Sequence, residues 1–102
     1  MRIIELDATE WKTVLDFYEA LLPELGAPEW HGRSVDALID SMIWGGINAL
    51  EPPFKVRVLH LASAPKPIRD HVELTAQALA EARAEYQTRN GGDVNVELQT
   101  VP

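Results

Sequence analysis

Three short strand-like segments, separated from one another by helical sequence, constrain the fold of this chain more than any other feature. Met1–Leu6 reads as a short strand. In Phe54–Leu61 the side chains alternate strictly, with Phe54, Val56 and Val58 on one face of the strand, and a third alternating strand begins at Val94. Strands joined through helices favour a parallel sheet with right-handed crossovers. The sequence therefore predicts an α/β protein with a small parallel three-stranded sheet.

The segments between these strands have helical periodicity and are interrupted by proline and glycine. Helices are predicted over Thr9–Leu22, Val35–Trp44 and Ile68–Arg89. Asp7 or Thr9 can cap the first helix, and Pro23 and Gly26 should stop it. Ser34 is a good N-cap for the second helix, and Ala62–Pro67 should form a loop. The order is β-α-α-β-α-β, a two-layer sandwich with helices on one face of the sheet, and residues 1–102 are predicted to form one domain.

The net charge of −7 is unevenly distributed. Residues 1–51 hold ten acidic and three basic residues, whereas residues 52–102 hold six of each. A direct nucleic-acid binder needs the opposite sign, because phosphate backbones are anionic. The acidic half favours a basic protein as partner, although the same charge can simply keep a small protein soluble.

Several kinds of chemistry lack the residues they need. The chain has no cysteine, which excludes disulfides, thiol nucleophiles and zinc-thiolate sites and points to the cytoplasm. The N-terminus does not resemble a signal peptide, and no stretch approaches the roughly 18 apolar residues of a membrane span. His31, His60 and His71 lack metal-binding spacing, and no phosphate-binding glycine motif is present. We expect no cofactor, no metal, no membrane association and no enzymatic activity; the oligomeric state is left open.

The second predicted helix carries a row of side chains facing away from its apolar stripe. Asp36, Asp40 and Trp44 lie at about 100°, 140° and 180° from Val35 around the helix axis. Two aspartates four residues apart repel by a few tenths of a kcal/mol, and only Asp36 is close enough to the helix N-terminus to be compensated by the dipole. The spacing fits either a binding row or a solvated face that Arg33 partly neutralises.

Two further places could contribute to a binding surface. Trp30 lies in a proline- and glycine-containing loop beside Glu29 and His31, which suits an interface anchor, although the loop could also fold the ring inward. On the last predicted helix, Glu81 and Glu85 lie nearly opposite the apolar face, a pattern typical of solvated glutamates.

The segment Pro28–Asp40, PEWHGRSVDALID, resembles the signature of the barstar family, the small intracellular inhibitors of secreted bacterial ribonucleases such as barnase. The family pattern is approximately Pro-Glu-aromatic-aromatic-Gly-x-Asn-Leu-Asp-Ala-Leu-x-Asp. The identical residues are Pro28, Glu29, Gly32, Asp36, Ala37, Leu38 and Asp40, and Trp30 stands at an aromatic position. The turn with Glu51 and Pro53 and the run Glu81–Glu85 extend the resemblance along the chain.

The resemblance implies a barstar-like fold and a ribonuclease inhibitor whose loop and second helix plug the enzyme's active site. It implies that Asp40 takes the place of a substrate phosphate with Asp36 in support, that Trp30 packs on the catalytic region, and that Glu81 adds a salt bridge. With Trp44 from the outward row, these residues are the predicted partner-binding set. The family also has a cis peptide before a proline here, so we expect the Pro52–Pro53 bond to be cis.

The chain also departs from the family pattern. Arg33 stands where the family often has an acid, Ser34 replaces the usual asparagine, and Ile39 stands where tryptophan is common. Two other functions therefore stay open: an interaction module with a partner other than a ribonuclease, and a small hydrolase that uses Asp36, Asp40 and His31.

Overall fold

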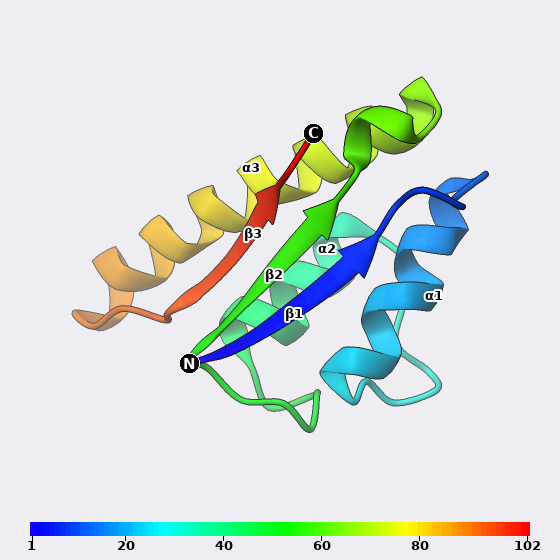
Figure 1. Cartoon of the computed structure of the whole chain (residues 1–102). Helices are drawn as coiled ribbons and strands as arrows, with labels where there is room; N and C mark the ends of the chain where they lie inside the picture. The colour runs from blue at the N-terminus through cyan, green and yellow to red at the C-terminus, as the bar shows by residue number, and fades with distance from the viewer.

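In the computed structural model, which describes all 102 residues, three strands form one open sheet. The strands are β1 (Arg2–Asp7), β2 (Phe54–Leu59) and β3 (Val96–Thr100), and they pair in parallel in the order β1-β2-β3. Figure 1 shows the three arrows pointing the same way, with the two termini at opposite ends of the sheet. The predicted parallel sheet and the order β-α-α-β-α-β are confirmed.

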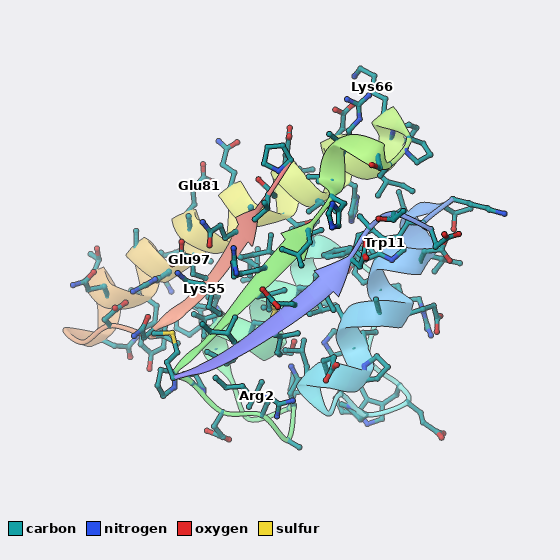
Figure 2. The ribbon with its side chains drawn as sticks, in the orientation of Figure 1. Arg2, Trp11, Lys55, Lys66, Glu81 and Glu97 are labelled. Atoms are coloured by element: carbon teal, nitrogen blue, oxygen red, sulfur yellow. The ribbon has the colours of Figure 1, made fainter.

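The helices are α1 (Val14–Leu25), α2 (Val35–Leu38), which continues directly as the π-helix η1 (Ile39–Trp44), the 3₁₀ turn η2 (Leu61–Ser63) and α3 (Lys66–Asn90). α1 lies beside β1, α3 beside β3, and α2 behind β2, so one layer of helices covers one face of the sheet (Figure 1). The strands alternate accordingly: the side chains of β2 at Phe54, Val56 and Val58 are buried. The other face is open, and Lys55 and Glu97 lie on it (Figure 2). None of the helices combines the length and apolar character that crossing a bilayer requires.

The interior is a cluster of 24 buried apolar residues with an aromatic group where α1 meets α3. The rings of Phe17 and Tyr18 lie 5.1 Å apart, and the Tyr18 hydroxyl lies 2.7 Å from Nε2 of His71 on α3. Burial raises the pKa of Tyr18 to about 12 and lowers the pKa of His71, so it favours the neutral form of both groups. His71 thereby links α1 to α3.

The first helix begins later than predicted because its N-cap is Thr13, not Asp7 or Thr9. Asp7 accepts hydrogen bonds from the backbone N–H and the hydroxyl of Thr9, at 2.9 and 2.6 Å, and so closes a turn before the helix. The Asp16 carboxylate instead accepts from the backbone N–H of Thr13, at 3.1 Å, and the helix starts at Val14. These hydrogen bonds lower the pKa of both carboxyl groups.

Proline and the end of the middle strand also behave differently from expectation. Pro23 lies inside the last turn of α1 and does not stop it; the helix ends at Leu25 and is capped by Gly26 in the left-handed conformation, φ +63°. A Cβ at Gly26 would lie 2.7 Å from the Cβ of Ala49, so glycine is required there for space as well. α3 begins at Lys66 because Pro67 falls in its first turn, where the missing N–H has no helical partner to lose. His60 is not part of β2: it has φ +58° and is exposed.

Candidate functional site

The loop between α1 and α2 turns two adjacent aromatic side chains in opposite directions. Trp30 is 73% exposed, whereas the ring of His31 is buried at 3%. Nδ1 of His31 lies 2.7 Å from the carbonyl oxygen of Gly32, and Nε2 lies 2.7 Å from the hydroxyl of Ser41 in η1. A carbonyl can only accept, so Nδ1 carries a proton and donates to Gly32, while Nε2 shares a hydrogen bond with the hydroxyl of Ser41. His31 thereby fastens the loop to the helix and leaves Trp30 outside.

Ser34 begins α2 as predicted, and the helical segment ends at Trp44 as predicted, but the π-helical form of its second half was not foreseen. The Ser34 hydroxyl accepts a hydrogen bond from the backbone N–H of Ala37, at 3.1 Å, so it satisfies one free donor of the first turn. From Ile39 to Trp44 the chain is a π-helix, and the N–H of Gly45 donates to the carbonyl of Asp40 at 3.1 Å. Such i→i+5 bonds widen the helical turn, so that side chains four residues apart lie closer to one another around the helix axis. Single π-helical turns occur often at functional sites.

Asp36 and Asp40 are both exposed and neither carboxylate forms a hydrogen bond or an ion pair within the chain. The expectation that Arg33 partly neutralises them is wrong. Arg33 extends toward α1, where its Nε and Nη2 donate to one oxygen of Glu19, at 3.2 and 3.0 Å. The positive charge that Arg33 introduces is therefore paired with Glu19 of α1. The two aspartates remain without an ion-pair partner.

Trp44 and Glu81 complete the predicted set. Trp44 ends η1, is 43% exposed, and its ring lies 5.2 Å from that of Tyr86 on α3. Glu81 is exposed on α3 (Figure 2) and accepts a hydrogen bond from Gln77 one turn earlier, at 3.3 Å. We call the exposed side chains of Trp30, Asp36, Asp40 and Trp44 the acidic surface; Glu81 belongs to a different helix that packs against η1.

The arrangement does not assemble a catalytic or metal-binding group. His31 is buried, both ring nitrogens are used by Gly32 and Ser41, and it forms no hydrogen bond with Asp36 or Asp40. The geometry that a hydrolase with these three residues would need is therefore missing. The structure holds no group of three His, Asp or Glu side chains suited to bind a metal ion.

What the acidic surface can do is attract and bind cations. Two unpaired carboxylates on one helical segment create a local negative field, and exposed indole rings stand before and after them along the chain. Large aromatic side chains beside charged groups are typical of protein–protein contact surfaces. The geometry favours a basic protein surface as the ligand.

Of these features, sequence reasoning missed the anchoring role of His31 and Ser41 and the π-helical turn. A single buried histidine in a glycine-containing loop carries no periodic signal, and its partner lies ten residues further along. The π-helix forms from residues whose pattern equally suits an α-helix.

Comparison with known proteins agrees with the geometry. No curated protein matches the chain. A sequence model of the family described as Barstar (barnase inhibitor) matches residues 1–99, which is nearly the whole chain. The α/β fold with an open parallel three-stranded sheet is the one expected of that family. On the match over residues 1–99, the chain belongs to the barstar family.

Proposed function

We propose that this protein inhibits a barnase-type ribonuclease by inserting the acidic surface into the enzyme's active site. The observation that carries the proposal is the unpaired state of Asp36 and Asp40 on an exposed helix of a barstar-family chain. The two like charges stand on successive turns without an internal partner, which slightly disfavours the helix. A basic partner removes that disadvantage.

The mechanism is competition for the groups that bind RNA phosphate. A ribonuclease active site must present cations to an anionic backbone, and a carboxylate can accept the same hydrogen bonds as a phosphate oxygen. Asp40 lies a full turn into the helix and is the candidate for this role, with Asp36 in support. The net charge of −7 and the acidic first half of the chain would speed encounter with the basic cavity.

The other predicted residues extend the contact around Asp40. Trp30 offers the most exposed large apolar side chain of the chain, at 73%, and would pack on the enzyme beside the cavity. Trp44 and Glu81 would contact the rim. In this proposal the protein acts by binding alone, without turnover, and does so in the cytoplasm against a nuclease that is destined for secretion.

The test is inhibition of barnase, and of other barnase-type ribonucleases, by variants that remove single carboxylates. Asp40→Ala should weaken inhibition at least about 100-fold, because it leaves buried enzyme cations without a partner. Asp36→Ala should weaken it less. Glu97→Ala, which removes an exposed carboxylate from the open face of the sheet, is the matched control and should inhibit like the parent. Undiminished inhibition by both aspartate variants would exclude the phosphate-mimic mechanism.

One observation favours a second candidate, a binding module for a different protein. Ile39 is half-buried against the core, at a position where tryptophan is common in the family, so the acidic surface offers a partner one aromatic side chain less. In that case barnase-type enzymes should not be bound, and immobilised protein should capture a partner that Asp40→Ala releases.

A further inference from the structure

A hollow lies beside the acidic surface. It has a volume of about 520 Å³ and lies between the end of η1, the turn that leads into β2, the last turns of α3 and the segment before β3. Trp44 forms one wall, so the hollow begins where the acidic surface ends. The turn contributes Glu51 and the cis peptide bond Pro52–Pro53, which confirms the predicted cis bond.

Two aromatic rings line the hollow side by side. The ring centroids of Trp44 and Tyr86 lie 5.2 Å apart with their planes inclined by 56°. Trp44 is 43% exposed and Tyr86 is half-buried, so ring surface faces the opening. Tyr86 can reach this position because α3 continues to Asn90 and passes the end of η1. Ring faces of this kind attract cations through their quadrupole.

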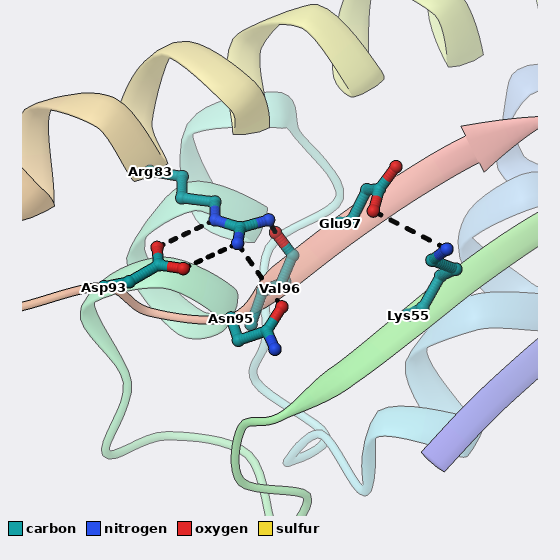
Figure 3. Close-up of polar contacts among 6 residues, drawn as sticks. All are labelled: Lys55, Arg83, Asp93, Asn95, Val96 and Glu97. Atoms are coloured by element: carbon teal, nitrogen blue, oxygen red, sulfur yellow. Dashed lines mark hydrogen bonds and ion pairs between the residues drawn. The ribbon is translucent and has the colours of Figure 1, made fainter. Parts of the chain in front are cut away.

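The two charged side chains that line the hollow are both acidic, and one of them is unpaired. No lysine, arginine or histidine lines it, whereas Glu51 and Asp93 do. Asp93 is already bound by Arg83, whose Nη2 and Nε donate to its two oxygens at 2.6 and 2.8 Å (Figure 3). Glu51 is exposed and forms no hydrogen bond or ion pair within the chain. The hollow therefore combines an aromatic wall with one unpaired carboxylate.

We propose that this hollow receives an arginine side chain of the bound ribonuclease, with the guanidinium stacked on Trp44 and Tyr86 and paired with Glu51. Arginine is favoured over lysine because its planar group can stack on a ring and donate two hydrogen bonds to a carboxylate at once. The site adds a specificity contact outside the phosphate-binding cavity. It rests on the proposed function for the identity of the partner, but its chemistry can be tested on the protein alone.

The first experiment titrates the ¹⁵N-labelled protein with N-acetyl-arginine amide and follows the indole N–H of Trp44 by NMR. The control ligand is N-acetyl-citrulline amide, which has nearly the same shape without the charge. Arginine amide should produce saturable shifts at Trp44 and at the backbone of Glu51, and Glu51→Gln should remove the saturation. Equal shifts with the citrulline ligand, or unchanged binding by Glu51→Gln, would overturn the assignment.

The second experiment measures the affinity of the variants for a ribonuclease that the unmodified protein inhibits. Glu51→Gln and Tyr86→Leu should each weaken binding roughly 5- to 30-fold, whereas Tyr86→Phe, which keeps the ring, should not. Thermal unfolding of each variant separates a lost contact from a damaged fold. If Asp40→Ala abolishes inhibition and neither Glu51→Gln nor Tyr86→Leu changes it, the hollow is not a contact and the inhibitor function stands. If no ribonuclease is inhibited, the proposed function fails and the arginine titration alone decides the chemistry of the hollow.

Discussion

The open face of the sheet and the acidic surface both present carboxylates to solvent, but only the sheet pairs them. Glu5 stands opposite Arg57 in the register of β1 and β2, and their oxygen and nitrogen lie 2.8 Å apart. Lys55 and Glu97 stand opposite each other in β2 and β3, at 3.7 Å (Figure 3). Asp36 and Asp40 have no such partner.

This difference matters little for stability and much for binding. Exposed ion pairs and opposite charges across strands contribute only about 0–1 kcal/mol each. A paired carboxylate, however, has its field cancelled by a cation a few ångströms away, whereas an unpaired one remains available to a partner. We therefore expect equal changes of charge on the two faces to have unequal effects on the affinity for a basic partner.

The largest effect should come from neutralising both aspartates of the acidic surface. We expect Asp36→Asn/Asp40→Asn to weaken ribonuclease binding by more than about 100-fold and to slow association. The matched variant Glu5→Gln/Glu97→Gln removes the same amount of charge and should change the affinity by less than about threefold. Surface plasmon resonance at low and high salt measures both. If the sheet variant slows association as much as the helix variant, total charge and not its placement controls the encounter.

The next effect concerns exposed apolar side chains on the same two faces. Trp30→Ala should weaken binding by a factor that corresponds to about 2 kcal/mol, as expected for an aromatic anchor, and should leave the melting temperature unchanged because the ring is exposed. Ile3→Ala removes an exposed side chain, 55% accessible, from the sheet face and should change neither. Calorimetry gives the affinities, and thermal unfolding gives the stabilities. A loss of stability in Trp30→Ala would show that the ring holds the loop rather than the partner.

The sheet could be predicted from the sequence because its pattern is local. Alternation in Phe54–Val58 sets which side chains are buried, and helical sequence between strands forces parallel pairing. The errors arose where a general rule met a specific context: Pro23 is tolerated in a last turn, and Pro67 in a first turn. His60 left the strand because its backbone turns left-handed, which no periodicity indicates.

The acidic surface could be predicted only in part. The spacing of Asp36, Asp40 and Trp44 indicated a shared face, and the family resemblance pointed to these residues. Arg33 pairs with Glu19 and not with the aspartates because of the way α1 packs, and such a tertiary contact has no signal in the local sequence. The buried hydrogen bond between His31 and Ser41, next to the exposed Trp30, likewise joins two residues that share no sequence pattern.

The buried hydrogen bond between His31 and Ser41 gives the third difference between the acidic surface and the open face of the sheet. The side chains of the sheet face are positioned by the strands themselves. Ser41→Ala leaves Nε2 of His31 buried without a partner and should lower the free energy of unfolding by about 1–2 kcal/mol. It should also speed amide exchange in the Trp30 loop. Ser63→Ala, at an exposed serine of η2, is the control and should be neutral. Unchanged exchange in the loop would show that the bond does not position Trp30.

The smallest effect is a pH dependence at the ion pair of Asp93 with Arg83, which joins α3 to the segment before β3. Hydrogen bonds from Arg83 lower the pKa of Asp93 below the ordinary value of about 3.9. A carboxyl group whose pKa is lower in the folded state contributes stability that is present above its unfolded pKa and is lost as the pH falls through its folded pKa. The protein should therefore lose stability below about pH 4, and Asp93→Asn should lose less over the same interval.

Arg83→Gln provides the matched control for that titration, because it removes the donor and leaves the carboxyl group. Both variants should show the same reduced slope of unfolding free energy against pH, measured by urea denaturation between about pH 5 and pH 2.5. The slope should not vanish, because hydrogen bonds also lower the pKa of Asp7 and Asp16 in the folded state. An unchanged slope in both variants would mean that the contact between α3 and the segment before β3 is too weak in solution to hold the proton off Asp93. The distinction between a paired and an unpaired face would then rest on the cross-strand pairs alone.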